Sequence, residues 1–149
     1  MSHMTRHVLW FLISVPLSFL FSAAIAQDRT DDPGMMAFNN ACRTCHTIRE
    51  GDNRLGPNLY GILGRKSGTT SGYHNYSSSM QNADIVWDEK NLEQFITKPE
   101  AVVSGNNMKP FSGVGSADVR AKIVNFLKNC ALCGPSCPTP RMCSTRKSP

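Results

Sequence analysis

The sequence predicts an all-α domain in which helices alternate with long loops. Apolar residues recur at spacings of three and four in three separate stretches, and no stretch shows the sustained period-two alternation of a strand. Residues 64–83 are rich in Gly, Ser, Thr, Asn and Tyr, which is typical of a long irregular loop. Inside a compact domain, such a loop usually wraps something.

Each of the three expected helices has a start signal. Asp32 precedes Pro33, which suits the first helical position. Asp88 caps a second helix that ends before Pro99, and Ser116 caps a third. The apolar faces of these helices carry Met35, Phe38, Cys42 and Cys45, then Leu92, Phe95 and Ile96, and finally Val119, Ile123, Phe126 and Leu127.

The N-terminal segment predicts export. Arg6 and His7 form a short basic start, a long apolar run follows, and Ala24-Ile25-Ala26 matches the small-x-small site of signal peptidase. An anchor that is never cut is the alternative, because the run is nearly long enough to span a bilayer. We therefore expect a signal at 1–26, one small domain at 27–129 and a Cys- and Pro-rich basic tail at 130–149.

The charge of the exported chain argues against nucleic acid as a partner. Of the 16 Lys and Arg residues only Arg6 lies in the signal, which leaves 15 against 11 acidic residues and a net charge of +4. Arg141, Arg146 and Lys147 in the tail supply three of these charges, so the domain itself is close to neutral. No stripe of Lys and Arg interleaved with aromatic residues appears in the sequence.

The strongest chemical signal is Cys42-Arg43-Thr44-Cys45-His46. Two thiols three positions apart on a helix can each bond a vinyl group of one haem, and the next residue then lies beneath the iron. A dithiol redox pair would need a βαβ setting that is missing here, and a zinc site would need four ligands. We therefore expect one covalently attached haem c, with His46 as the first axial ligand of its iron.

The residues alone leave the sixth ligand of the iron open. Met35 and Met36 lie on the attachment helix, which cannot reach round to the opposite face of the haem. His74 and Met80 lie in the polar loop, and their chemistry suits a ligand. Met108 follows a turn and is far enough along the chain to cover the other haem face, so spacing slightly favours it.

Several stretches between Phe38 and Lys128 match a known family in order. They are Cys-Arg-Thr-Cys-His-Thr at 42–47, Gly-Pro-Asn-Leu-Tyr-Gly-Ile-Leu-Gly-Arg-Lys-Ser-Gly at 56–68, Gly72-Tyr73, Tyr76, Ile85-Val86-Trp87, Pro99, Asn107-Met108 and Ile123-Val124-Asn125-Phe126-Leu127. Over this range the chain resembles the class I cytochromes c, close to the mitochondrial protein and its bacterial electron-carrier relatives. The resemblance implies the small cytochrome c fold, with three main helices and long loops wrapped round one covalently attached haem.

The resemblance also assigns roles to individual residues. It implies that Met108 is the sixth ligand, and that the Pro57 carbonyl accepts the ring N–H of His46 and so fixes the imidazole. In the mitochondrial relatives a tyrosine near the methionine sulfur usually stands where this chain has Phe95. The residues implied to hold a haem propionate are Arg65, Tyr76 and Trp87.

These roles predict a one-electron carrier that is not an enzyme. Two strong axial ligands leave the iron no open position, and a thioether ligand raises the reduction potential. The family implies a quinol-oxidising membrane complex as donor and a terminal oxidase or photosynthetic reaction centre as acceptor. A peroxidase is the alternative if the sixth ligand is labile. We expect a periplasmic monomer that meets the membrane only peripherally, or through the N-terminal segment if this is not cut.

The tail carries Cys130, Cys133, Cys137 and Cys143. A second haem is not expected there, because Gly134 rather than histidine follows Cys133. Four cysteines so close together could bind zinc or form two disulfides. An oxidising compartment makes disulfides the stronger expectation.

Overall fold

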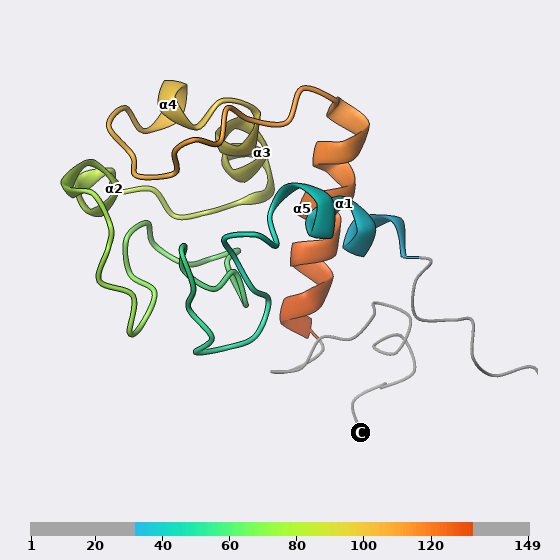
Figure 1. Ribbon diagram of the computed structural model, residues 1–149, viewed down its shortest axis with the longest axis horizontal. Helices are drawn as coiled ribbons and strands as arrows, with labels where there is room; N and C mark the ends of the chain where they lie inside the picture. Colours follow the sequence, from blue (N-terminus) through green and yellow to red (C-terminus); the bar gives the residue numbers. More distant parts are fainter. Residues whose placement is uncertain (1–31, 133–149) are drawn as a thin grey trace, which may run out of the picture.

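The computed structural model describes residues 32–132, and Figure 1 shows this part as helices joined by long loops. No β-strand occurs in this range, in which Lys66 and Val86 form an isolated antiparallel bridge. The all-α class expected from the sequence is confirmed. In chain order the helices are α1 (Pro33–Ala41), α2 (Ser78–Asn82), α3 (Glu89–Thr97), α4 (Pro99–Val102) and α5 (Ala117–Leu132).

The three longer helices begin where the sequence indicates. The Asp32 carboxylate accepts the backbone N–H of Met35 at 2.8 Å and so caps α1. Asp88 and Asn91 form a reciprocal capping box at the start of α3, in which each side chain accepts the other's backbone N–H. Ser116 immediately precedes α5. Local capping chemistry therefore sets the positions of all three.

The first helix is shorter than expected, so Cys42 and Cys45 lie beyond its end. The backbone N–H groups of Cys42 and Arg43 share the Phe38 carbonyl, at 2.8 and 3.2 Å, and the regular α-helical ladder stops there. Tighter turns follow, in which the N–H groups of Cys45 and His46 both reach the Cys42 carbonyl, at 3.1 and 2.9 Å. The attachment motif thus occupies compact turns rather than a helix.

The polar loop at 64–83 is not irregular throughout, because it ends in the short helix α2. The Ser77 hydroxyl accepts the backbone N–H of Met80 at 3.1 Å and provides the cap that starts this helix. The Ser-rich composition of this stretch predicted a loop, but the Ser77 side chain caps a helix there.

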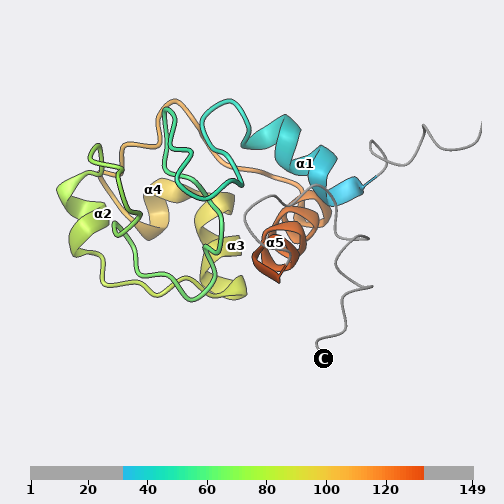
Figure 2. The ribbon, with the colours of Figure 1, turned by 90° about the horizontal axis from the view of Figure 1, so that it is seen from below.

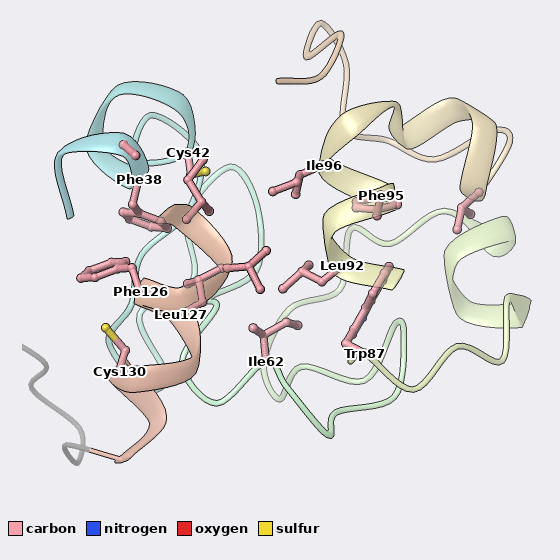
Figure 3. Packing of buried hydrophobic residues seen from close by; sticks show 14 residues of the cluster. Phe38, Cys42, Ile62, Trp87, Leu92, Phe95, Ile96, Phe126, Leu127 and Cys130 are labelled. Carbon is pink, nitrogen blue, oxygen red and sulfur yellow. The ribbon is translucent and has the colours of Figure 1, made fainter. Parts of the chain in front are cut away.

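The core forms where α1 crosses α5 and where α3 packs against both α5 and α4 (Figures 1 and 2). At the first crossing the Phe38 and Phe126 rings lie 5.5 Å apart. A Cβ at Gly34 would lie 2.8 Å from the Cβ of Phe126, so a glycine lets the two helices approach. Figure 3 shows these two rings on one side of the core, with Trp87 and Phe95 on the other.

The last helix continues through Leu132, so the boundary expected at Asn129 falls inside it. Cys130 is fully buried in the core, and it is disulfide-bonded. The signal expected at 1–26 and the cysteines Cys133, Cys137 and Cys143 lie outside the described residues. Within residues 32–132, no helix has both the length and the apolar character that a membrane crossing needs.

Candidate haem-binding site

A cavity of about 520 Å³ lies inside the domain, and it has the size and apolar character of a ligand pocket. Figure 3 shows Leu127, Leu92 and Ile62 pointing toward one another from three different parts of the chain. All three line the cavity, so the core is built around it instead of filling it. The other core residues that line it are Cys42, Trp87, Phe95, Ile96 and Ile123.

Both cysteines of the attachment motif line this cavity. Cys42 is buried and Cys45 half-buried, and neither is in a disulfide. Burial, together with the neighbouring Cys45, raises the pKa of Cys42 to about 12. The Cys42 thiol is therefore neutral in the cavity wall, next to the space that a bound group would occupy.

The imidazole of His46 is held in one orientation. Its Nδ1 lies 2.8 Å from the Pro57 carbonyl oxygen, and a carbonyl can only accept, so Nδ1 carries the proton. The other nitrogen, Nε2, is then left with a lone pair, as a metal ligand requires. Burial lowers the pKa of His46, and the hydrogen bond to Pro57 opposes this shift. The ring is therefore neutral at pH 7.

Gly56 lets the backbone pass directly over the His46 ring. A Cβ at this position would lie 2.7 Å from Nδ1 and closer still to Cε1, which no side chain can do without displacing the ring. The Gly56 N–H donates to the Cys45 carbonyl at 2.8 Å, so the backbone at Gly56 is also hydrogen-bonded to the attachment motif. His46 is thus confined by packing as well as by its hydrogen bond.

The cavity separates the candidates for the sixth ligand. Met108 and Met80 line it, and both are half-buried. Met35, Met36 and His74 are not among the described residues that line it. Two of the five candidates are therefore positioned to reach a group in the cavity, one from the polar loop and one from the segment after α4.

Arg65 presents a charge at the cavity wall. Its guanidinium donates to the Asn58 carbonyl at 2.9 Å and to the Thr70 hydroxyl at 2.7 Å, which fixes the side chain. Burial lowers the pKa of Arg65, and Tyr76 opposes this shift. A cation that is partly removed from water is stabilised by a nearby anion such as a carboxylate.

Tyr76 and Trp87 line the same cavity as Arg65. The Tyr76 ring stands edge-on to Tyr73 at 4.8 Å, and the Trp87 ring lies 5.0 Å from Phe95. Among the described residues, neither the Tyr76 hydroxyl nor the Trp87 indole N–H has a hydrogen-bond acceptor. The cavity therefore offers two unused donors and a guanidinium, which suits the carboxylates of a haem.

Asn106 is a residue of this site that the sequence did not reveal. Its side chain is 4% exposed and lines the cavity, and its Oδ1 accepts the backbone N–H of Met108 at 2.9 Å. The Gly105-Asn106-Asn107 run predicted a turn, and turn asparagines are mostly exposed. No local pattern distinguishes the buried Asn106 from the exposed Asn107.

Known relatives of the chain indicate which cofactor the cavity residues suit. No protein-family model matches the chain. A cytochrome c from Ginkgo biloba is 34% identical over 109 residues, which cover 71% of this chain and 95% of that protein. Cytochromes c from Euglena viridis and Theileria annulata are each 38% identical over 64% of this chain, and the matches cover 91% and 81% of those proteins.

Both lines of observation agree on the cofactor. The cavity brings together two thiols, an imidazole with a free Nε2, methionine thioethers and an apolar wall, which suit a covalently attached haem. The relatives are cytochromes c that match this chain over most of their own length. The small cytochrome c fold and the haem c cofactor expected from the sequence are therefore confirmed, and the chain belongs to the cytochrome c family.

Proposed function

We propose that this protein is an exported one-electron carrier whose single haem iron is ligated by His46 and Met108. The observation that carries the proposal is that Cys42, Cys45, His46 and Met108 all line one cavity, although Met108 is distant from the others in sequence. Bound haem supplies an iron that changes its oxidation state by one electron. Membership of the cytochrome c family supports the electron-carrier role.

The chain's own residues would hold the haem and keep its iron closed. Cys42 and Cys45 would hold the haem through thioethers, and the Pro57 carbonyl, by fixing the His46 ring, would leave Nε2 available to the iron. A Met108 thioether would complete the coordination, raise the potential and exclude oxygen or peroxide. Such a site changes little between oxidation states and supports electron transfer rather than an enzymatic reaction.

Arg65, Tyr76 and Trp87 are proposed to hold a haem propionate. Support comes from the half-buried guanidinium of Arg65 and from the two donors that have no acceptor among the described residues. Hydrogen bonds from these groups would stabilise a carboxylate that the cavity removes from water. This arrangement fixes one end of the haem while the thioethers fix its vinyl edge.

The proposed partners are membrane electron-transfer complexes. We infer a quinol-oxidising complex as donor and a terminal oxidase or photosynthetic reaction centre as acceptor, as the class I carriers imply. The apolar N-terminal pattern supports export to the periplasm, as a monomer or held by an uncut anchor. Lys66, Lys98 and Lys109 are exposed, but Lys66 is paired with Asp84 at 2.6 Å, so long-range steering by charge should be weak.

The visible spectrum of site variants tests the ligand assignment. Met108→Ala should keep its haem on a denaturing gel, because the thioethers remain, but should become high-spin with a lower potential. Met80→Ala is the matched control, since Met80 lines the same cavity. It should keep low-spin iron and the sulfur-to-iron charge-transfer band. If Met80→Ala loses that band and Met108→Ala does not, the assignment is wrong.

A further inference from the structure

The Glu100 carboxylate accepts three hydrogen bonds from the turn that precedes Met108. It lies in the first turn of α4, which leads into the segment carrying Met108 (Figure 1). One carboxylate oxygen accepts the Gly105 backbone N–H at 2.9 Å and the Ser104 hydroxyl at 3.2 Å. The other oxygen accepts from Asn106 Nδ2 at 3.1 Å. The carboxylate thus spans from the helix to three successive residues of the turn.

Asn106 links Glu100 to Met108 through hydrogen bonds of its side-chain amide. Its Nδ2 donates to the Val103 carbonyl at 2.8 Å as well as to Glu100, and its Oδ1 accepts the Met108 backbone N–H at 2.9 Å. Asn106 is buried, so water cannot easily replace these partners. The three residues form a continuous chain of hydrogen bonds from the surface carboxylate to the backbone of Met108.

An ionised Glu100 favours one of the two orientations of the Asn106 amide. A carboxylate only accepts and a backbone N–H only donates. In the observed orientation the NH₂ group faces Glu100 and the oxygen faces Met108 N–H. The flipped amide would set its oxygen against the carboxylate and its NH₂ against the N–H of Met108. Both contacts would then be repulsive, so the carboxylate, together with the Val103 carbonyl, favours the orientation that holds Met108.

We propose that Glu100 is a positioning residue which, through the Asn106 amide, restrains the backbone of Met108 and slows loss of the methionine from the haem iron. This inference rests on the proposed ligation of the iron by Met108. Met108 is half-buried, so its own packing confines it less than His46 is confined. The hydrogen bond from Gly105 N–H lowers the pKa of Glu100 against the opposing effect of desolvation, with help from the Lys109 charge. Glu100 is therefore ionised at neutral pH.

The test compares Glu100→Ala with Glu89→Ala in the haem-loaded protein. Glu89 is a matched control because it is also an exposed glutamate in a first helical turn, and its partner is Lys128, in α5. The readout is the rate at which imidazole displaces methionine from ferric iron, followed by the sulfur-to-iron charge-transfer band. We expect Glu100→Ala to raise this rate roughly three- to tenfold, as loss of a net hydrogen bond would. Glu89→Ala should leave it unchanged.

A second measurement separates the inference from the ligand assignment. Hydrogen exchange at the Met108 amide reports on the Asn106 contact whether or not Met108 binds iron, and the Trp87 amide, bonded to the Arg65 carbonyl at 2.9 Å, is the reference. We expect Glu100→Ala to speed exchange at Met108 roughly three- to tenfold and to leave Trp87 unchanged. Unchanged exchange at Met108 would overturn the proposed restraint.

The combined outcomes distinguish the possible failures. Faster Met108 exchange with an unchanged displacement rate would overturn the functional part of the inference, since the contact would then be structural only. A uniform loss of stability, in which Met108 and Trp87 amides exchange faster together, would overturn it as well. If Met108→Ala keeps the wild-type band, the ligand assignment itself fails. The exchange data would still show whether Glu100 restrains the turn.

Discussion

The His46 side and the Met108 side of the cavity are built in different ways. His46 is buried, its ring is bonded to the Pro57 carbonyl at 2.8 Å, and the Gly56 backbone lies against it. Met108 is half-buried and is hydrogen-bonded through its backbone: its N–H donates to Asn106, which also contacts the exposed Glu100, and its carbonyl accepts the Phe111 N–H at 3.0 Å. One proposed ligand is held through its side chain, the other through its backbone.

The Met108 side is the side on which the site can open more easily. Displacing His46 would require the backbone at Gly56 and Pro57 to move, and this backbone is tied to the attachment motif by the Gly56–Cys45 hydrogen bond. Displacing Met108 would require the turn at 104–107 and the hydrogen bond between Met108 and Phe111 to loosen, and both are formed within one short segment. Regions with exposed hydrogen bonds and few buried contacts open at lower free energy than packed ones. We therefore expect ligand exchange to occur on the Met108 side.

The largest effect should follow from filling the space over the His46 ring. Gly56→Ala should lower the free energy of unfolding of the haem-loaded protein by about 3 kcal/mol, because the new methyl group overlaps a ring that its hydrogen bond prevents from moving. Denaturant unfolding measures this directly. Gly115→Ala is the control: a Cβ there meets nothing within 4 Å, so its effect should stay within about 0.5 kcal/mol. Equal stability of both variants would show that the His46 side is not tightly packed.

A smaller effect should come from adding a hydrogen-bond donor near the methionine. Phe95 is buried, lines the cavity and stands where mitochondrial relatives usually have a tyrosine. In Phe95→Tyr, a hydroxyl donating to the Met108 sulfur would draw electron density from it and favour the reduced iron. The rise in reduction potential should correspond to no more than the net free energy of one ordinary hydrogen bond, roughly 0.5–1.5 kcal/mol. Redox titration measures it, and a clear fall would contradict the proposed position of Phe95.

The smallest effect concerns the pH dependence of the Met108 restraint. The folded pKa of Glu100 is lowered from its ordinary value of 4.5, so its contribution is present above pH 4.5 and is lost as pH falls through the lower folded pKa. The ratio of Met108 amide exchange rates between Glu100→Gln and wild type should therefore exceed one at pH 6. It should approach one well below pH 4.5.

Lys109 provides the control for that titration, because its charge also lowers the pKa of Glu100. Lys109→Gln should move the loss of the restraint to higher pH. A ratio that stays constant across the acid range would mean that the charge of Glu100 does not hold the turn.

Features that depend on local chemistry could be predicted from the sequence. The Cys42-Arg43-Thr44-Cys45-His46 run fixes thiols and imidazole at the spacing that haem attachment needs, and no long-range contact is required to recognise it. The helix starts at Asp32 and Asp88 were equally clear, since a cap bonds backbone groups only three residues away. A family resemblance added the roles of Met108 and Pro57, which spacing alone had left open or unseen.

Tertiary structure alone decided which residues became buried. Asn106 looked like an exposed turn residue and Cys130 like the start of the tail, yet both lie in the interior. The cavity also removed Met35, Met36 and His74 from the candidate ligands while leaving Met80 and Met108. Burial depends on contacts between segments far apart in the chain, such as α1 with α5 and α3 with α5. Local patterns carry no information about such contacts, because the same short sequence can face water or the core depending on what packs against it.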